Sequence, residues 1–175
     1  MSTITAQNGN VPSVVDGQRV RWSDSGAYGQ VYLVGDLAVK TWAEDPAYER
    51  WLEFVLADDG KQVYSKHLPV VHWYSKEMRV AVLEKLTPTK VPHPRLDYPM
   101  GLWSLASLHR EEPALVAGQA WVLALYAEIE KMCREELPNG HAPYHEDCHA
   151  GNWMQRADGT IVVTDPMASC EESSS

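Results

Sequence analysis

Turn-forming residues divide the first half of this chain into short segments, and that division constrains the fold more than any other feature of the sequence. Five segments are rich in Val, Trp, Tyr or Leu and are predicted to be strands: 19–24, 30–34, 37–42, 70–74 and 78–84. The pair Gly35-Asp36 separates the second and third segments and is typical of a two-residue hairpin turn. Hairpin-linked strands pair antiparallel, so an antiparallel sheet is expected in this half.

One helix is predicted between the third and fourth strands. Asp45-Pro46 has the pattern of an N-cap followed by Pro at the first helical position, and Asp58-Asp59-Gly60 indicates a stop. These two signals enclose about three helical turns. The order of strands, helix and strands predicts an α+β fold.

The second half is predicted to be mainly helical after an extended linker over residues 88–99, where prolines recur. A long helix is predicted from Pro113 to the stop signal Pro138-Asn139-Gly140. Its apolar residues recur at three- and four-residue steps, as one buried face requires. They are Leu115, Val122, Leu125, Ile129 and Met132. A final hairpin is predicted from segments 153–155 and 160–164, joined through Asp158-Gly159.

Composition and charge argue against several classes of protein. The 175 residues fit one domain or two small lobes, and their formal net charge is −9 with no basic run. Nucleic acid is therefore not expected as a direct partner, because phosphate neutralisation needs clustered Lys and Arg. Cys133, Cys148 and Cys170 lack C-x-x-C spacing, so neither a disulfide framework nor a zinc knuckle is indicated. No apolar run of about 18 residues is present, and no membrane partner is expected.

Candidate catalytic chemistry is concentrated in His145-Glu146-Asp147-Cys148-His149-Ala150-Gly151-Asn152 and in Thr164-Asp165-Pro166. The spacing of Asp147, Asn152 and Asp165 matches the protein-kinase pattern H-R-D-x-x-x-x-N followed by the acid of D-F-G. Asp147 is expected to orient or accept the proton of a substrate hydroxyl. Asn152 and Asp165 are expected to supply oxygen ligands to Mg²⁺, and the predicted hairpin would bring them to one edge.

Two other interpretations of this motif stay open. His145, Asp147 and His149 alternate along an extended segment and could together bind a transition metal. The motif could also be a polar loop without a site. Neither interpretation gives a role to a second pattern, which lies in the first half of the chain.

That second pattern combines glycines with a lysine in an apolar strand. Gly26, Gly29 and Val31 match part of a glycine-rich loop, with Asp24 in place of its first glycine. Glycine lets backbone amides approach phosphate oxygens closely, and Val31 would cover an adenine. Leu37-Ala38-Val39-Lys40 matches V-A-I-K, whose lysine binds nucleotide phosphates. A lysine among apolar residues needs such a counter-charge.

Two further segments complete the expected nucleotide site. Glu49 and Glu53 lie four residues apart on one helix face, and either carboxylate could hold Lys40, with Glu49 preferred. Segment 80–86 resembles the strand that leads into a kinase hinge, with Leu83 as gatekeeper. The expected nucleotide-binding residues are Gly26, Gly29, Val31, Ala38, Lys40, Glu49, Glu84 through its carbonyl and Leu86 through its amide.

The motif residues resemble one family. His149-Ala150-Gly151-Asn152, Met154 and Thr164-Asp165-Pro166 are similar to the early serine/threonine protein kinase of T-seven-like podophages, and the resemblance runs from about Ser25 to Met167. It implies a two-lobed protein-kinase-like fold that uses ATP and Mg²⁺. It also implies phosphorylation of Ser and Thr on bacterial host proteins, during host takeover by a bacteriophage and in the host cytoplasm.

The resemblance implies a domain layout with a short second lobe. Residues 1–17 would be a flexible leader, 18–87 an N-lobe of sheet and one helix, 88–99 a linker, 100–168 a reduced helical C-lobe with the catalytic hairpin, and 169–175 a polar tail. Asp165 is followed by Pro166-Met167 instead of Phe-Gly, and Pro fixes φ, so no in/out switch is expected. The sequence ends about ten residues after Asp165, so a minimal, truncated C-lobe is expected.

Two alternative functions follow from the same residues. A kinase-fold binding protein that inhibits a host factor by occupancy, without catalysis, would accord with a short C-lobe. A small-molecule phosphotransferase is the other alternative, because the core D-x-H-x-G-N is shared with aminoglycoside- and choline-kinase-like enzymes. A phage-type protein kinase is the leading prediction because both halves of its pattern occur in the right order.

Overall fold

A computed structural model shows an α+β protein with antiparallel sheets and, in its described part, two α-helices. The described residues are 14–15, 18–19, 21–25, 29–88, 92–93, 96–99, 120–135, 144–147 and 152–169. Contacts divide the chain into two compact units. The first unit comprises Met1–Asp45 and Val70–Leu86, and the second comprises Pro46–Pro69 and Thr87–Ser175.

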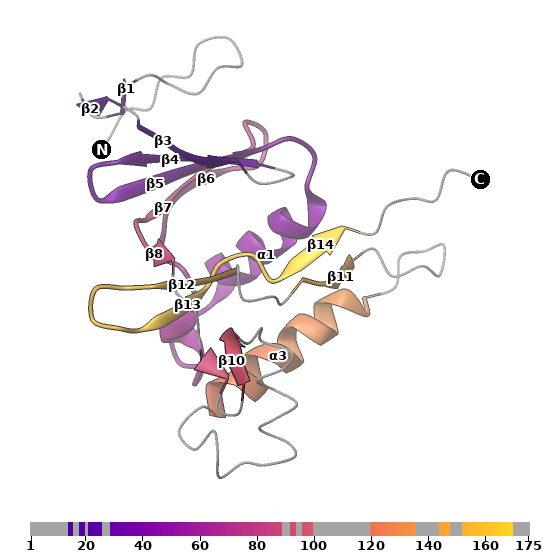
Figure 1. Ribbon diagram of the computed structural model, residues 1–175. Coiled ribbons are helices and arrows are strands. Elements are labelled where there is room, and N and C mark those ends of the chain that lie inside the picture. Colours follow the sequence, from indigo (N-terminus) through magenta and orange to yellow (C-terminus); the bar gives the residue numbers. More distant parts are fainter. Residues whose placement is uncertain are drawn as a thin grey trace. The chain divides into compact units, whose positions relative to one another are not determined.

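The first unit is built on a five-stranded antiparallel sheet of order β3-β4-β5-β7-β6 (Figure 1). Its strands are β3 (Arg21–Ser25), β4 (Gly29–Val34), β5 (Leu37–Trp42), β6 (Val71–Ser75) and β7 (Val80–Glu84). The predicted hairpin turn is confirmed, since Gly35 has φ 57° between β4 and β5, a value that favours glycine.

One strand of this sheet begins later than predicted. The segment predicted from Met78 becomes strand β7 only at Val80, because the preceding residues form the turn out of β6. Arg79 has φ 52°, and its N–H donates to the carbonyl of Lys76 at 3.1 Å. The N–H of Met78 donates to Oγ of Ser75 at 3.2 Å. These local bonds replace ladder bonds at the two residues.

The strand register separates the side chains of the sheet into two faces. On one face, Val34, Val39, Val80 and Val82 form a buried apolar cluster against which Tyr32 and Leu37 pack. Residues that face each other across an antiparallel pair lie on the same side, so the opposite face is defined by two register rows. These rows are Val31–Lys40–Ala81 and Leu33–Ala38–Leu83.

Before this sheet, β1 (Val14–Val15) pairs antiparallel with β2 (Gln18–Arg19). Strand β1 therefore lies in the predicted leader. The segment predicted as a strand over 19–24 is divided between β2 and β3.

The second unit contains the predicted helix, α1 (Pro46–Ala57), followed by the 3₁₀ turn η1 (Ser65–His67). The limits of α1 confirm the start signal at Asp45-Pro46 and the stop near Gly60, where φ is 77°. One face of α1 is buried and consists of Ala47, Tyr48, Trp51, Leu52 and Val55. The N–H of Ala47 donates to Oγ of Ser169 at 3.3 Å, which ties the start of α1 to the C-terminal segment.

The second helix, α3 (Ala120–Cys133), confirms the predicted periodicity, since Val122, Leu125, Ile129 and Met132 are all buried. Leu115 and the predicted start at Pro113 lie outside the described residues. The predicted end at Pro138 is wrong, because the helix ends at Cys133. Its last turn tightens there: the N–H of Arg134 is shared between the carbonyls of Glu130 (3.0 Å) and Lys131 (3.2 Å).

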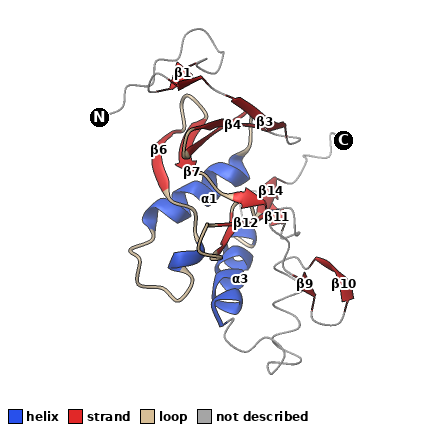
Figure 2. Cartoon of the chain, turned by 60° about the vertical axis from the view of Figure 1, so that its left-hand side comes forward, coloured by secondary structure: helices blue, strands red, loops and turns tan. Residues whose placement is uncertain are grey.

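Short antiparallel strands complete the second unit. Strand β12 (Trp153–Gln155) lies between β13 (Ile161–Val163) and β8 (Thr87–Pro88). The β12–β13 hairpin was predicted and is confirmed, with φ 87° at Gly159 and the N–H of Thr160 bonded to Oδ1 of Asp158 (2.9 Å). Strand β11 (Tyr144–Glu146) pairs with β14 (Met167–Ser169), and β9 (Pro92–His93) with β10 (Leu96–Pro99) (Figure 2). The Pro-rich segment predicted as a linker thus contributes strands.

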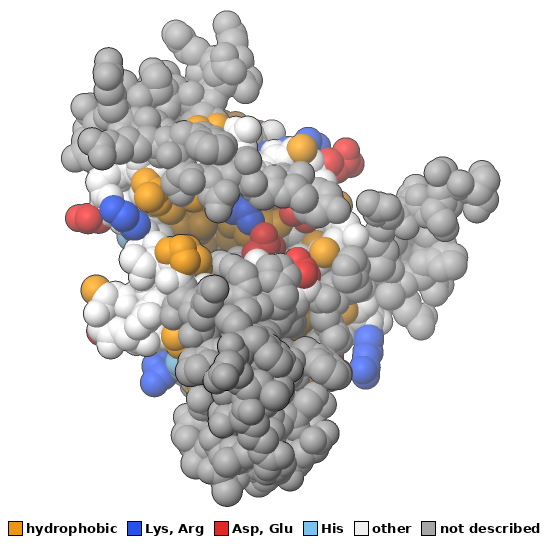
Figure 3. Space-filling view, in the orientation of Figure 1, with side chains coloured by type: hydrophobic (Ala, Val, Ile, Leu, Met, Phe, Trp, Pro, Cys, Tyr) orange, Lys and Arg blue, Asp and Glu red, His pale blue; other side chains and the backbone are white. Residues whose placement is uncertain are grey.

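The described surface carries charges of both signs. On the face shown in Figure 3, acidic and basic side chains both occur, and no run of basic ones is visible among its described residues. No helix in the described part of the chain is long and apolar enough to cross a membrane.

Candidate functional site

The C-terminal motif residues are brought together where strands β11 and β14 end. Glu146 of β11 is paired with Met167 of β14, so Asp147 and Pro166 face each other immediately beyond the ladder. The N–H of Asp147 donates to the carbonyl of Pro166 at 2.8 Å. This bond fixes the backbone of Asp147 beside the residue that follows Asp165.

Asn152 is tied to the same place by its side chain and by its carbonyl. Its Nδ2 donates to the carbonyl of Asp147 at 2.7 Å and lies 3.5 Å from Oδ2 of the same residue. Its own carbonyl accepts two bonds from Thr164, one from the N–H at 3.0 Å and one from Oγ1 at 3.2 Å. Asp165 lies between Thr164, which is bonded to Asn152, and Pro166, which is bonded to Asp147.

These hydrogen bonds and the peptide bonds of Asp165 close a ring of five residues, which we call the loop ring: Asp147, Asn152, Thr164, Asp165 and Pro166. The side chains of Asp147, Asn152 and Asp165 are half-buried around it. With Nδ2 of Asn152 directed at Asp147, its Oδ1 is the atom left for a cation. Amide and carboxylate oxygens, such as those of Asn152 and Asp165, are ligands of the kind that Mg²⁺ prefers.

The alternative metal set of His145, Asp147 and His149 lies mostly outside the described residues. Within them, no three His, Cys, Asp or Glu side chains cluster in a way that could hold a metal ion. The side chains of His145 and His149 lie outside the described residues.

A second group of predicted residues lies together on the sheet of the first unit. Lys40 is half-buried on β5 and has Val31 and Ala81 as register partners. Ala38 lies two residues before Lys40, on the same face, in register with Leu83. The strand register therefore places Val31, Ala38, Lys40 and the predicted gatekeeper Leu83 on one face. At the end of this face Trp42 stacks on Tyr74, with ring centroids 6.1 Å apart.

Gly29 has a packing role in addition to the predicted phosphate contact. A Cβ built on Gly29 would lie 2.6 Å from the carbonyl oxygen of Thr41, a backbone atom of the neighbouring strand. Close approach of β4 and β5 therefore requires glycine at this position whether or not a nucleotide binds. Gly26 lies outside the described residues.

The predicted hinge residues end strand β7 in the first unit. The N–H of Glu84 donates to the carbonyl of Val70 at 3.0 Å, and its Oε1 accepts the N–H of Val70 at 2.8 Å. The next amide, that of Lys85, donates to the carbonyl of Asp36 at 3.1 Å. These three bonds hold the end of β7, and one of them gives the Glu84 side chain a structural role that sequence analysis missed.

The two candidate partners of Lys40 lie on α1, in the second unit. Glu49 is half-buried in the first turn, where a carboxylate interacts favourably with the helix dipole, and Glu53 is exposed. Lys40 belongs to the first unit. The structure thus forms two separate groups of predicted residues, one around Lys40 and one around the loop ring.

Sequence analysis also missed Thr164 and the carbonyl of Pro166. Thr164 precedes the acid in the motif, and its hydroxyl and N–H both donate to the carbonyl of Asn152. A local signal points to this pair, since Thr164 ends the second predicted strand, Asn152 directly precedes the first, and the two ends meet when the hairpin closes.

Comparison with known proteins adds no family assignment. No protein-family model matches the chain, and a search of curated proteins finds no significant relative.

Proposed function

We propose that this chain is a phage-type protein kinase that transfers the γ-phosphate of ATP to Ser or Thr of bacterial host proteins. The observation that carries the proposal is the loop ring, which joins Asp147 and Asn152 by hydrogen bonds to the two residues that flank Asp165. Phosphoryl transfer depends on positioning and charge neutralisation more than on covalent chemistry, so fixed oxygen ligands are what the reaction needs.

The first unit supports the same proposal through its strand order. Lys40 lies on the third strand of the five-stranded sheet, and a helix follows before the last two strands. In protein kinases the phosphate-binding lysine lies on the third strand and pairs with a carboxylate on the following helix. Val31 and Ala38 share its face and would pack on an adenine, with the Glu84 carbonyl and Leu86 amide at its edge.

Asp147, Asn152 and Asp165 of the loop ring have distinct tasks under this proposal, and Lys40 has a fourth. Asp147 orients the substrate hydroxyl and accepts its proton as the oxygen attacks, a role worth roughly 10²–10⁴ in rate. Asn152 Oδ1 and the Asp165 carboxylate would hold Mg²⁺. When bound, Mg²⁺ neutralises the phosphate oxygens of ATP. Lys40 contributes a further positive charge to the α- and β-phosphates.

Phosphate transfer from γ-labelled ATP with Mg²⁺ tests the proposal, with bacterial lysate as acceptor. We expect label with the native protein and a loss of at least about 100-fold in Asp147→Asn, because the base is removed. Asp59→Asn is the matched control: it makes the same acid-to-amide change on an exposed loop of the second unit. Equal labelling by Asp147→Asn and the control would refute the proposed base.

Nucleotide binding gives a second, independent test. Lys40→Ala and Asp165→Ala should each weaken Mg²⁺-dependent ATP binding, and unchanged affinity in both would refute the site. A host protein retained by Asp147→Asn, with host inhibition intact and no labelling by the native chain, would instead support the alternative of inhibition by occupancy.

A further inference from the structure

The β12–β13 hairpin carries the loop-ring residues at its open end. Asn152 directly precedes β12, and Thr164 and Asp165 directly follow β13. Two strands of three residues form a marginal hairpin in isolation. Strand β8 adds only two paired residues beside β12, so contacts outside the strands also hold the hairpin, and with it Asn152 and Asp165, in place.

The 3₁₀ turn η1 contacts the hairpin through a buried histidine. His67 is 6% exposed, and its Nδ1 lies 2.7 Å from the carbonyl of Ile161 on β13. A carbonyl can only accept, so Nδ1 carries the hydrogen and donates it. The imidazole also stacks on Trp121 of α3, with centroids 3.7 Å apart, and Trp121 meets Trp153 edge-to-face at 5.8 Å. Trp153 is the neighbour of Asn152 in sequence.

Arg156 directly follows β12 and also bonds to this turn. Its guanidinium donates to the carbonyls of Lys66 and Leu68, the latter at 2.9 Å, and these two residues flank His67. Its backbone N–H donates to the carbonyl of Thr160 within the hairpin, at 3.0 Å. The planar guanidinium fork can serve two carbonyls at once, which an ammonium group cannot do in the same geometry.

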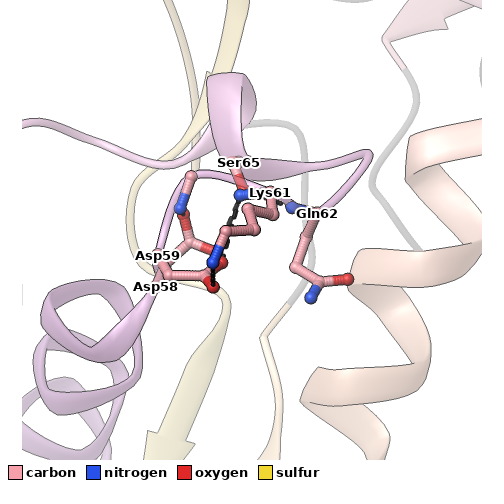
Figure 4. A network of polar contacts seen from close by, with 6 residues as sticks. Asp58, Asp59, Lys61, Gln62 and Ser65 are labelled. Carbon is pink, nitrogen blue, oxygen red and sulfur yellow. Dashed lines mark hydrogen bonds and ion pairs between the residues drawn. The ribbon is translucent and has the colours of Figure 1, made fainter.

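The turn that receives these bonds is itself held by the loop after α1 (Figure 4). Asp58 accepts the N–H of Gly60 and the hydroxyl of Ser65, each at 3.0 Å. Oγ of Ser65 also accepts the N–H of Gln62 at 3.0 Å, which fixes the first residue of η1. The hairpin is therefore attached to a turn that is anchored to helix α1.

Electrostatics favour a neutral His67 in this contact. Burial lowers the pKa of His67, and the positive charges of Lys66 and Arg156 lower it further, while the bond to Ile161 opposes them. Its Nε2 is buried and has no hydrogen-bond partner among the described residues. A neutral imidazole with hydrogen on Nδ1 satisfies this arrangement.

We propose that Arg156 and His67 are positioning residues, which clamp hairpin β12–β13 onto η1 and thereby keep Asn152 and Asp165 in place beside Asp147. What the positioned residues bind rests on the proposed function, whereas the clamp itself does not. Neither residue touches the loop ring, so their effect on the site is transmitted through the hairpin. Outer residues that orient metal ligands change metal affinity by roughly 10–100-fold when altered.

Hydrogen exchange tests the clamp in the absence of any ligand. Arg156→Gln removes the fork, His67→Phe keeps an aromatic ring but removes the Nδ1 donor, and Arg50→Gln is a matched control in the same unit. Amides of Trp153–Gln155 and Ile161–Val163 should exchange at least about tenfold faster in the first two variants and at the native rate in the control. Amides of β4 and β5 should be unchanged in all three, which would show that the sheet stays folded. Native exchange of the hairpin in both variants would overturn the proposal.

Arg156→Lys covers the case in which Arg156→Gln does not fold. It retains the charge but replaces the rigid planar fork by a compact ammonium group on a flexible stem, so we expect an intermediate increase in hairpin exchange. The Mg²⁺ concentration needed for half-maximal ATP binding should rise about tenfold, and saturating Mg²⁺ should restore binding, because the ligands are displaced and not lost. Native exchange in Arg156→Lys would refute a two-carbonyl clamp. Absence of Mg²⁺-dependent ATP binding by the native protein would refute the proposed function and leave the exchange result to decide the clamp.

Discussion

Replacing Asn152 by alanine or by aspartate separates two effects on the stability of the loop ring: the loss of a hydrogen-bond donor and the repulsion between two carboxylates. Nδ2 of Asn152 is a donor 2.7 Å from the carbonyl of Asp147 and 3.5 Å from its carboxylate oxygen Oδ2. Alanine removes the donor. Aspartate is nearly the same shape but directs an oxygen, with negative charge, at two oxygens.

The distances give the size of each effect. Loss of the donor leaves a half-buried carbonyl without that bond, which costs about 1 kcal/mol in the free energy of unfolding. Two unit charges at the 3.5 Å separation repel by about 1 kcal/mol in water and about 5 kcal/mol at an effective dielectric constant near 20. Because both side chains are half-buried, we expect Asn152→Asp to lose about 3 kcal/mol and Asn152→Ala about 1 kcal/mol.

Urea denaturation near pH 7 and near pH 4 measures both the cost of the lost donor and the cost of the charge repulsion. The repulsion exists only while both carboxyls are ionised, so the extra loss in Asn152→Asp should be larger near pH 7 than in acid, where carboxyl groups take up protons. The loss in Asn152→Ala should change little between these values. Gln155→Glu, the same change of amide to acid elsewhere in the hairpin, is the control. Equal losses in the aspartate and alanine variants near pH 7 would refute the orientation of the Asn152 amide.

Three further predictions follow from other contacts. Gly29→Ala should lose roughly 1–3 kcal/mol in urea denaturation, because its Cβ would meet the Thr41 carbonyl at 2.6 Å, and a neutral effect would contradict that approach. Burial lowers the pKa of His67 below the unfolded value of 6.5, so the unfolded chain binds more protons and stability should decline as pH falls below about 6.5. If His67→Phe loses stability in the same way as pH falls, the loss comes from other titratable groups and not from His67. Arg50→Ala should cost less than about 1 kcal/mol and less still in high salt, because its pair with Glu135 (2.9 Å) is exposed; a larger, salt-independent loss would show otherwise.

Local signals were sufficient for the elements and several of their limits. Gly35-Asp36 and Asp158-Gly159 specify hairpins because their backbone conformations suit few other residues, and both hairpins are present. Asp45-Pro46 specifies the start of α1 for a similar reason. The periodicity in α3 predicted its buried face, since a helix must repeat apolar residues at that spacing to bury one side.

Local signals did not predict element limits or strand pairs that depend on a specific hydrogen bond or on a distant segment of the chain. The end of α3 was placed too late because its last amides tighten onto closer carbonyls, and β7 starts late because Arg79 adopts a positive φ. The pairing of β8 with β12 joins residues 87–88 to 154–155, and no turn signal links such distant segments.

The sequence by itself determined which residues are candidates for the proposed phosphate chemistry, because the residue types and their spacing within 147–165 are local properties. Tertiary structure decided how they are held. The loop ring needs strand β14 to return beside β11, and the hairpin contacts His67 and the carbonyls of η1, which lie about 90 residues earlier in the chain. Such contacts depend on which buried surfaces pack together, and a backbone carbonyl as acceptor leaves no trace in the amino-acid sequence.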